Sequence, residues 1–169
     1  VYDVGNRWLG WRMPPIPVVH AIEFYHDLIR QGKIRIAKKF EGPVTFHDPC
    51  NVVRGRGLHE MGRYITREMC DELIEMHPNR EHNYCCCAGG GVINCGPPYK
   101  MKRIEGNRIK AEQLFAVKSR GAKVIIAPCH NCHSGLEDIN RYYGLGMEIK
   151  FLGDILYEVM EKPEETEGE

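Results

Sequence analysis

The stretch Lys123-Val124-Ile125-Ile126-Ala127-Pro128-Cys129-His130-Asn131-Cys132 decides the fold that this sequence predicts. Its first half is a continuous apolar run, as in a strand that is buried on both faces of a parallel sheet. Its second half places Cys129 and Cys132 directly after that strand. A helical pattern follows through Leu136, Ile139 and Tyr143. The stretch therefore predicts a buried parallel strand whose carboxyl end carries two thiols.

Strand and helix patterns alternate on both sides of this stretch. Short β-type runs are expected at residues 44–47, 82–84 and 147–152. Helical spacing is seen at residues 18–29, 65–76, 99–120 and 152–160. This alternation predicts an α/β fold, a Rossmann-like three-layer domain with a mainly parallel sheet. Sites in such folds lie beyond the carboxyl ends of the strands.

The prolines near the start mark the boundary of the predicted domain. Pro14, Pro15 and Pro17 exclude a helix until after them, so residues 1–16 are expected to be an irregular leader. Residues 17–161 form the predicted domain, and residues 162–169 an acidic, disordered tail. The chain begins with Val1 instead of Met, and we expect it to be a fragment of a longer protein.

Composition excludes several classes of function. The 169 residues are 43% hydrophobic and 27% charged, which is typical of a globular domain. The formal net charge of zero gives no electrostatic basis for binding nucleic acid or anionic lipid. No apolar run approaches the length of a membrane span, and the start lacks a signal peptide. We expect no nucleic-acid partner and no direct insertion into a membrane.

Cysteine is the residue type that points to chemistry. The chain has eight cysteines, and Cys85-Cys86-Cys87 run directly into a glycine-rich turn at residues 89–91. Adjacent cysteines do not readily form a disulfide with each other, because the bond requires a particular Cα separation. A triplet and a Cys-x-x-Cys motif favour reduced, metal-binding thiols over a disulfide framework. Cys50 also follows a predicted strand, so three groups of cysteines are expected at one edge of the sheet.

The cysteine pattern indicates metal binding more directly than it indicates which metal is bound. A structural zinc commonly uses four ligands from two Cys-x-x-Cys motifs, and only one is present. A cubane iron–sulfur cluster often takes four cysteines from one short run. An excess of thiolates over separate segments suits a larger or unusual iron–sulfur cluster. Cys129 and Cys132 alone would also fit a redox-active dithiol at a helix N-terminus. His47, His130 and His133 are interpreted as orienting or structural residues.

Other polar and sulfur residues receive more ordinary interpretations. Cys70 is expected inside a helix as a small buried residue. Cys95 is interpreted as a spare ligand, a redox partner thiol or a buried residue, and burial is favoured. Residues 54–57 are expected to be flexible and basic. The basic residues that begin the 99–120 helix suggest a solvated face, or alternatively a docking surface for an acidic partner; they are Lys100, Lys102, Arg103, Arg108 and Lys110.

Three motifs together resemble a known family. They are His47-Asp48-Pro49-Cys50, the pair Cys85-Cys86 followed by glycines, and Ala127-Pro128-Cys129-His130-Asn131-Cys132. This arrangement resembles the cysteine-rich CCG domain of heterodisulfide reductases, glycolate and lactate oxidase subunits and related proteins. The resemblance covers about residues 18–160. More narrowly, residues 83–97 and 105–114 are similar to the DsrK type, the HdrD-like subunit of the Dsr membrane complex of sulfate-reducing organisms.

The sequence departs from the family pattern in two places. If Gly89-Gly90 anchor the alignment, Cys87 replaces the glycine of the Cys-Cys-Gly motif. Shifting by one residue makes Cys86-Cys87 the pair, so Cys87 is the alternative to the preferred Cys85. The interval from the pair to Cys129 is also longer than is usual in the family.

The resemblance implies a function and a set of ligands. It implies a non-cubane [4Fe-4S] cluster bound by Cys50, Cys85, Cys86, Cys129 and Cys132. At that cluster a disulfide- or trisulfide-type bond is reduced or formed, and for the DsrK type the implied substrate is the small sulfur-carrier protein DsrC. Arg54 and His133 are candidate substrate-binding residues, with the basic face after Tyr99 as a further candidate to receive the carrier.

The resemblance also implies partners and a location. These are an electron-donating ferredoxin-like domain or subunit and a membrane cytochrome b-type subunit. The implied location is cytoplasmic, at the cytoplasmic face of a membrane-bound complex. Two alternatives stay open: a zinc-stabilised or electron-relay assembly module, and a CCG subunit of a glycolate or lactate oxidase.

Overall fold

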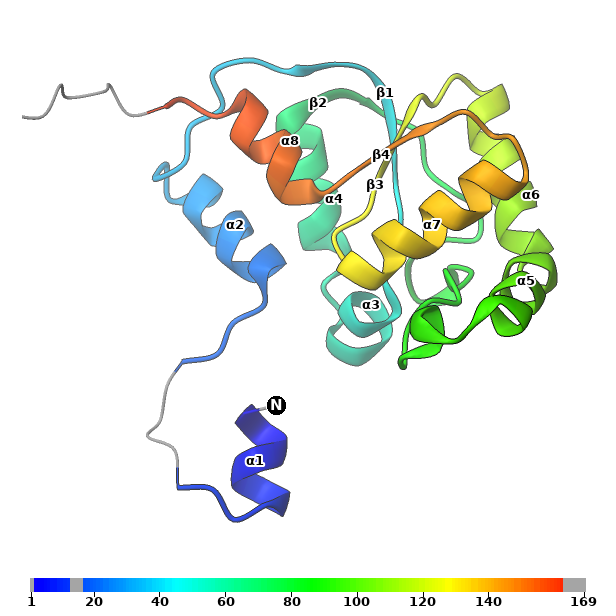
Figure 1. Ribbon diagram of the computed structural model, residues 1–169. Helices are drawn as coiled ribbons and strands as arrows, with labels where there is room; N and C mark the ends of the chain where they lie inside the picture. Colours follow the sequence, from blue (N-terminus) through cyan, green and yellow to red (C-terminus); the bar gives the residue numbers. More distant parts are fainter. Residues whose placement is uncertain (1, 13–16, 163–169) are drawn as a thin grey trace, which may run out of the picture.

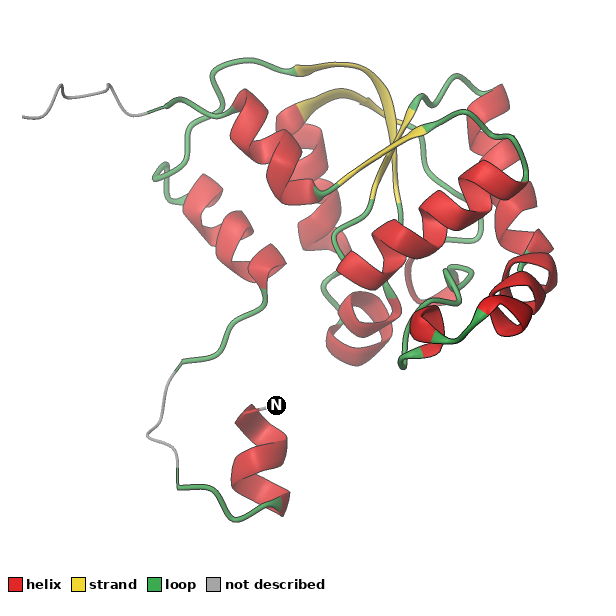
Figure 2. Ribbon diagram, in the orientation of Figure 1, coloured by secondary structure: helices red, strands yellow, loops and turns green. Residues whose placement is uncertain are grey.

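A single parallel sheet organises the chain. The computed structural model describes residues 2–12 and 17–162. Within these residues the strands are β1 (Phe40–Phe46), β2 (Cys70–Leu73), β3 (Val124–Ile126) and β4 (Glu148–Lys150). They lie in the order β2-β1-β3-β4, and every neighbouring pair is parallel (Figure 2). The predicted α/β class with a parallel sheet is confirmed.

The described residues also form eight α-helices and two short 3-10 helices (Figure 1). The α-helices are α1 (Tyr2–Trp8), α2 (Ala21–Arg30), α3 (Cys50–Arg56), α4 (His59–Met69), α5 (Pro97–Gly106), α6 (Arg108–Ser119), α7 (His130–Tyr142) and α8 (Leu152–Val159). The 3-10 helices are η1 (Arg80–His82) and η2 (Val92–Asn94).

The sheet buries both of its faces, which gives three layers. Val44, Phe46, Val124 and Ile126 belong to one hydrophobic core, together with apolar residues of α2, α3, α4 and α8. Ile125 belongs to a second core, together with residues of α6 and α7. Because side chains alternate along a strand, successive residues of β3 enter different cores. The two cores explain why residues 124–126 are continuously apolar.

Strand β2 was not predicted from the sequence. The expected helix through residues 65–76 ends at Met69, and the chain then runs along β1 as β2. Cys70 is therefore a strand residue, although it is buried as expected. Asp71 and Glu72 are exposed on this edge strand, and this polarity hid the strand signal.

Several other boundaries differ from expectation. Residues 82–84 are not a strand, because η1 ends at His82 and irregular backbone follows. The helix expected over 99–120 is two helices, α5 and α6, separated at Asn107. Residues 54–56 belong to α3 instead of a flexible segment, and β1 begins at Phe40, before Gly42-Pro43.

The predicted leader also contains a helix, since α1 spans Tyr2–Trp8. Residues 13–16 of that leader and residues 163–169 of the predicted tail lie outside the described residues. In the described part of the chain, none of the helices combines the length and apolar character needed to cross a bilayer.

Candidate metal centre

Two of the three predicted cysteine groups, the triplet and the Cys129/Cys132 pair, meet where β1 and β3 end. These two strands are neighbours, with Phe46 opposite Ile126, and the His47 amide donates to the Ile126 carbonyl at 2.9 Å. The chain leaves β1 through α3 and α4 on one face of the sheet and leaves β3 through α7 on the other (Figure 1). Such a switch point opens a crevice beyond the strand ends, which is where α/β folds bind ligands.

Two sulfurs form the centre of the site. The Sγ atoms of Cys86 and Cys132 lie 3.1 Å apart, and both residues are buried. His47, Cys86 and Cys132 each offer one ligand atom, and these atoms all lie within 4.8 Å of one another. Cys129, half-buried at the end of β3, hydrogen-bonds Cys132. The structure thus joins residues that are 46 positions apart in the chain.

Hydrogen bonds between these sulfurs favour thiolates. The pKa of Cys86 is lowered, chiefly by hydrogen bonds from Cys132 and Cys85 and further by one from His47. The Cys132 hydrogen bond lowers the pKa of Cys129 to about 6, assisted by the backbone N–H groups of Cys132 and Asn131 at the start of α7. Cys132, which donates to both, has a raised pKa. Thiolate is the form of cysteine that binds metal.

The remaining predicted ligands, Cys50 and Cys85 with Cys87 as the alternative, are less buried than Cys86 and Cys132. Cys85 is exposed, and its hydrogen bond to Cys86 is the main reason that its pKa is raised. Cys87 has a left-handed backbone with φ of 55° and directs its thiol toward the Cys85 carbonyl, 3.9 Å away. Cys50 is exposed at the first position of α3. The choice of Cys85 over Cys87 as a ligand stays a prediction.

His47 is held by a chain of buried polar side chains. Its Nδ1 lies 3.3 Å from Nδ2 of Asn83, and Asn83 Nδ2 also donates to the Asp48 carbonyl at 3.2 Å. Lys110 donates to Asn83 Oδ1 at 3.2 Å and to Gln113 Oε1 at 2.5 Å. His47 and Lys110 are fully buried, and burial lowers the pKa of His47 to about 4 and that of Lys110 to about 7.

A buried ion network holds the loop that follows β1. Arg63 of α4 donates two hydrogen bonds to the Asp48 carboxylate, both at 2.8 Å, and both side chains are fully buried. The same guanidinium donates to Glu75 at 2.7 and 2.9 Å. Asp48 also accepts the Arg80 amide at 2.7 Å. Asp48 therefore ties the β1 end to the start of the segment that carries the cysteine triplet.

Side chains from several elements fix that irregular segment. Arg54 of α3 donates to the carbonyls of Glu81 and Asn83, each at 2.8 Å. Asn107, between α5 and α6, donates to the Cys85 carbonyl at 3.0 Å. These bonds satisfy carbonyls that have no strand or helix partner. The backbone before the triplet is thus positioned without regular secondary structure.

The residues predicted to bind substrate have other contacts here. Arg54 holds the cysteine segment through the two carbonyls, and the ring of His133 stacks on Phe151 with centroids 4.1 Å apart. Their binding role stays a prediction. The expected burial of Cys95 is wrong, because Cys95 is exposed after η2.

The prediction that the basic residues of segment 99–120 form a solvated face is also wrong in part. Lys110 and Arg103 are buried, and Arg103 pairs with Asp138, as does Lys100. Lys102 and Arg108 are exposed as expected. Lys110 is the buried residue beside the site that sequence reasoning missed, because nothing local distinguishes it from its exposed basic neighbours.

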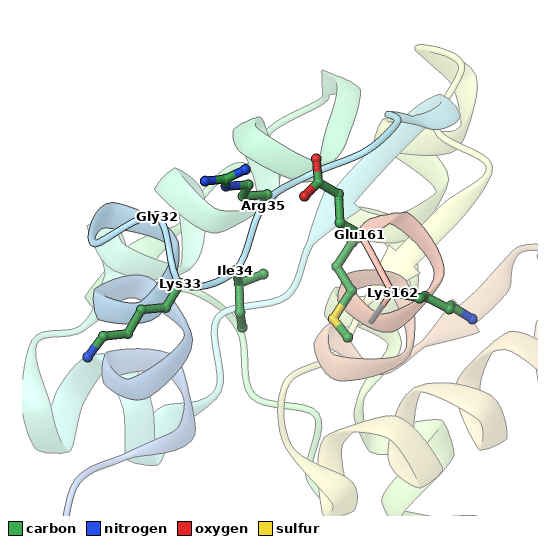
Figure 3. A pocket seen from close by; sticks show the side chains of 7 residues that line it. Gly32, Lys33, Ile34, Arg35, Glu161 and Lys162 are labelled. Carbon is green, nitrogen blue, oxygen red and sulfur yellow. The ribbon is translucent and has the colours of Figure 1, made fainter. Parts of the chain in front are cut away.

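A separate hollow of about 350 Å³ lies between the segments that follow α2 and α8 (Figure 3). It is lined by Gly32, Lys33, Ile34, Arg35, Met160, Glu161 and Lys162. None of these residues is a cysteine or a histidine, so the chemistry of a metal centre belongs to the crevice and not to this hollow.

The donor set of the crevice fits a soft-metal centre. Sulfur ligands select zinc, copper(I) or iron–sulfur clusters over hard cations. Gly89 and Gly90 follow the triplet, and a Cβ added at either would meet nothing within 4 Å. The cysteine segment therefore has open space beside it. Cys132 contacts Cys86 and hydrogen-bonds Cys129, so these three thiols are placed to hold such a group. Cys50 and Cys85, which are both exposed, stay predicted ligands.

Comparisons with known proteins agree with this chemistry. The CCG cysteine-rich domain family matches residues 44–137. The Hdr-like menaquinol oxidoreductase iron-sulfur subunit of Archaeoglobus profundus is 35% identical over 116 residues, which are 66% of this chain and 20% of that protein. A dihydromethanophenazine:CoB–CoM heterodisulfide reductase subunit of Methanosarcina acetivorans is 35% identical over 133 residues, which are 78% of this chain and 31% of that protein.

A relative with a different name shares the same region. The EtfAB:quinone oxidoreductase of Syntrophomonas wolfei is 28% identical over 129 residues, 72% of this chain and 17% of that protein. The chain thus spans between about a sixth and a third of the length of these relatives. No solved structure matches it.

The matched residues run from β1 into α7 and include Cys50, the triplet and the Cys129/Cys132 pair. They contain the whole crevice described above. The chain therefore belongs to the CCG cysteine-rich domain family, whose relatives here include subunits of heterodisulfide-reductase-like iron–sulfur oxidoreductases.

Proposed function

We propose that this chain is the iron–sulfur domain of an oxidoreductase that reduces or forms a disulfide-type bond. One observation carries the proposal: thiol groups from two distant segments converge at the β1/β3 crevice, with Cys86 and Cys132 3.1 Å apart. The low pKa values of Cys86 and Cys129 support metal binding at this point. The names of the relatives favour an iron–sulfur group over other soft metals.

The proposed cofactor is a non-cubane [4Fe-4S] cluster. Its proposed ligands are Cys50, Cys85, Cys86, Cys129 and Cys132, with Cys87 as the alternative to Cys85. When bound, such a group supplies electrons one at a time next to a site where a substrate sulfur can bind. The chain itself contributes thiolates at the strand ends, the hydrogen bond from His47 and open space beside Gly89 and Gly90.

The finer parts of the proposal concern substrate and partners. The overall change is R–S–S–R′ + 2 e⁻ + 2 H⁺ → R–SH + R′–SH, or its reverse. Similarity to DsrK-type subunits suggests DsrC as the sulfur carrier and a role in dissimilatory sulfur metabolism. A ferredoxin-like domain or subunit supplies the electrons, and a cytochrome b-type subunit anchors the complex at the cytoplasmic face of a membrane. Arg54 and His133 are the proposed substrate-binding residues at the rim of the crevice.

Turnover of a disulfide-type substrate tests this function. The complete polypeptide that contains this chain is purified anaerobically, reduced with a viologen dye and given a mixed disulfide or trisulfide. We expect release of free thiol, lost in Cys86→Ser and retained in Cys95→Ser, since Cys95 is exposed outside the crevice. Thiol release that Cys86→Ser leaves unchanged would contradict the proposal.

A zinc site is the second candidate, and one observation favours it. His47, Cys86 and Cys132 place ligand atoms within 4.8 Å of one another, and Cys129 adjoins them. Three sulfurs and one imidazole nitrogen form a set that is common in structural zinc sites. In that case the domain is an assembly or electron-relay module without a substrate site. Metal analysis of the anaerobically purified protein separates the two candidates, because this one expects zinc and no sulfide.

A further inference from the structure

The buried chain Lys110–Asn83–His47 carries an inference that rests on, and deepens, the proposed function. His47 opens the first cysteine motif, whereas Asn83 and Lys110 lie outside the three motifs, and each of these residues is at least 97% buried. Together they connect α6, the segment before the triplet and the end of β1. Their hydrogen bonds specify which nitrogen of His47 bears a hydrogen.

The orientation of the Asn83 amide is fixed from two sides. Lys110 Nζ lies 3.2 Å from one end of the amide. The lysine can donate a hydrogen bond there whether or not it is charged, so an oxygen at this end is satisfied. The Asp48 carbonyl lies 3.2 Å from the other end and can only accept, so this end is the NH₂ group. If the amide were flipped, its NH₂ group would face the Lys110 amine and its oxygen would face the Asp48 carbonyl oxygen. Both contacts therefore select the same orientation.

This orientation determines the tautomer of His47. The Asn83 NH₂ group faces His47 Nδ1 at 3.3 Å, so Nδ1 must be the acceptor. In a neutral imidazole the other nitrogen, Nε2, then bears the hydrogen. One ring nitrogen of His47 and the Sγ atoms of Cys86 and Cys132 all lie within 4.8 Å of one another. Because Nδ1 is turned to Asn83, Nε2 is the nitrogen left to donate its hydrogen to the Cys86 sulfur.

A metal-binding histidine shows the opposite arrangement. It presents a bare nitrogen to the metal and donates its other N–H to a carboxylate, a carbonyl or water. Here Nδ1 faces a donor, so it has no hydrogen to give. We propose that Lys110, acting through Asn83, is a positioning residue that makes His47 a hydrogen-bond donor to the Cys86 sulfur and prevents it from binding the metal.

The consequence for the site is a centre bound by sulfur alone. A hydrogen bond to a ligand sulfur stabilises its negative charge and is one of the features that set the potential of an iron–sulfur cluster. His47 would therefore tune the proposed cluster without occupying a coordination position. The proximity of His47 to Cys86 and Cys132, which by itself suggests a Cys₃His zinc site, has this different explanation.

The test observes the His47 nitrogens directly. The complete polypeptide is labelled with [15N]histidine and purified anaerobically with whatever metal it holds, and His47→Gln identifies the signals. If the centre is paramagnetic, pulsed EPR distinguishes a nitrogen bound to iron from one beyond the sulfur. If it is diamagnetic, long-range 15N–1H NMR reads the tautomer. We expect no metal-bound nitrogen, and the Nε2–H tautomer in the diamagnetic case.

Asn83→Asp provides a variant of almost identical shape. A carboxylate at position 83 accepts from Lys110 and from His47 Nδ1, so we expect the tautomer to reverse and the hydrogen bond to Cys86 to be lost. Asn94→Asp is the matched control, since it makes the same chemical change at an exposed position of the same segment, in η2. In this control the His47 signals should be unchanged.

The outcomes separate this inference from the proposed function. A metal-bound His47 nitrogen, or the Nδ1–H tautomer in the wild type, overturns the inference whatever metal is found. A protein without iron that shows Nε2–H refutes the iron–sulfur proposal and supports the inference. If Asn83→Asp does not fold, the wild-type measurement alone decides the matter.

Discussion

The two sides of the metal centre are built in different ways. Cys129 and Cys132 follow a buried strand and begin a 13-residue helix, so regular secondary structure places them. The segment 79–96, which carries the triplet, has only two 3-10 turns of three residues each. Its position depends on side chains of α3, α6, the β1 end and the α5–α6 junction, which hydrogen-bond its backbone or its Asn83 side chain. One half of the site is set by topology and the other by individual polar contacts.

This difference predicts how the site responds to substitutions in each half. Substitutions in the strand-end half act through the ligands themselves. Substitutions in the irregular half act at a distance, through residues that touch no metal. We expect the largest effect from substitutions that remove the metal. Substitutions that break the buried ion network come next, and a substitution that only crowds a local contact has the smallest effect.

The largest effect is expected for Cys132→Ser, at the meeting point of the two halves. Cys132 contacts Cys86 across the interface and hydrogen-bonds Cys129. Even outer-shell partners of a metal cost roughly 10–100-fold in affinity, so loss of a ligand should cost at least that. Iron retained after gel filtration with a chelator measures the effect. Cys95→Ser is the control and should retain wild-type iron, and equal retention in both variants would contradict the site.

Arg63→Ala should strongly destabilise the irregular half. Arg63 and Asp48 are both fully buried and share a bidentate ion pair, so truncation leaves an uncompensated carboxylate. Breaking a buried pair of this kind costs about 3–5 kcal/mol. Urea unfolding under anaerobic, reducing conditions measures the loss.

Arg67→Ala is the matched control for that change, because Arg67 is 58% exposed and lies 3.9 Å from Glu75. Its unfolding free energy should stay within about 0.5 kcal/mol of the wild type, as is usual for surface substitutions. A loss in Arg67→Ala similar to that in Arg63→Ala would show that the buried pair does not organise this half.

Lys110→Met should change the dependence of stability on pH. Burial lowers the pKa of Lys110 from 10.5 to about 7. Between those values the unfolded chain binds the proton and the folded chain does not, so the wild type gains stability as the pH rises. Relative to Lys110→Met, its unfolding free energy should increase by about 1.4 kcal/mol per pH unit in this window.

Lys102→Met controls for the loss of a lysine, since Lys102 is exposed on α5. It should follow the wild type at every pH. Parallel curves for the wild type and Lys110→Met would show that folding does not lower the pKa of Lys110.

The smallest expected effect is that of Gly135→Ala, at the contact of α7 with the triplet. A Cβ at this position would lie 2.6 Å from Ala88 Cβ and 3.1 Å from the Cys86 carbonyl oxygen. Overpacking of this kind typically costs about 1–3 kcal/mol. Gly106→Ala, where the added Cβ meets nothing within 4 Å, should not destabilise. Thermal unfolding of both variants compares them, and equal losses would contradict this close approach.

The same difference explains what the sequence could predict. The strand at 124–126, the helix after Cys129 and the convergence of cysteine groups all follow from local hydrophobic patterns and from the geometry of parallel sheets. The three-layer arrangement follows from the same patterns. These features depend on short stretches of sequence that the chain presents directly.

The irregular half could not be predicted in this way. The contact of Asn107 with the Cys85 carbonyl spans 22 residues, and that of Lys110 with Asn83 spans 27. No local pattern distinguishes Lys110 from the exposed basic residues around it. His47 was interpreted as an orienting residue, and its hydrogen bond to Cys86 agrees with that role. The direction of its hydrogen required the positions of Asn83 and Lys110.

Strand β2 shows a further limit on what can be predicted from the sequence. Its four residues include two exposed acidic side chains, and it pairs only with β1 at the edge of the described sheet. An apolar helical spacing that continued from α4 concealed it. Edge strands tolerate charge because one of their sides faces water, so their hydrophobic signal is weak.

Iron and sulfide analysis, combined with EPR of the oxidised protein, tests the central claim most directly. The anaerobically purified protein should be brown and contain about four iron and four sulfide per chain, as expected of a [4Fe-4S] cluster. Its EPR signal should disappear in Cys132→Ser and persist in Cys95→Ser. A colourless protein that holds one zinc, even after iron–sulfur reconstitution, would contradict the account.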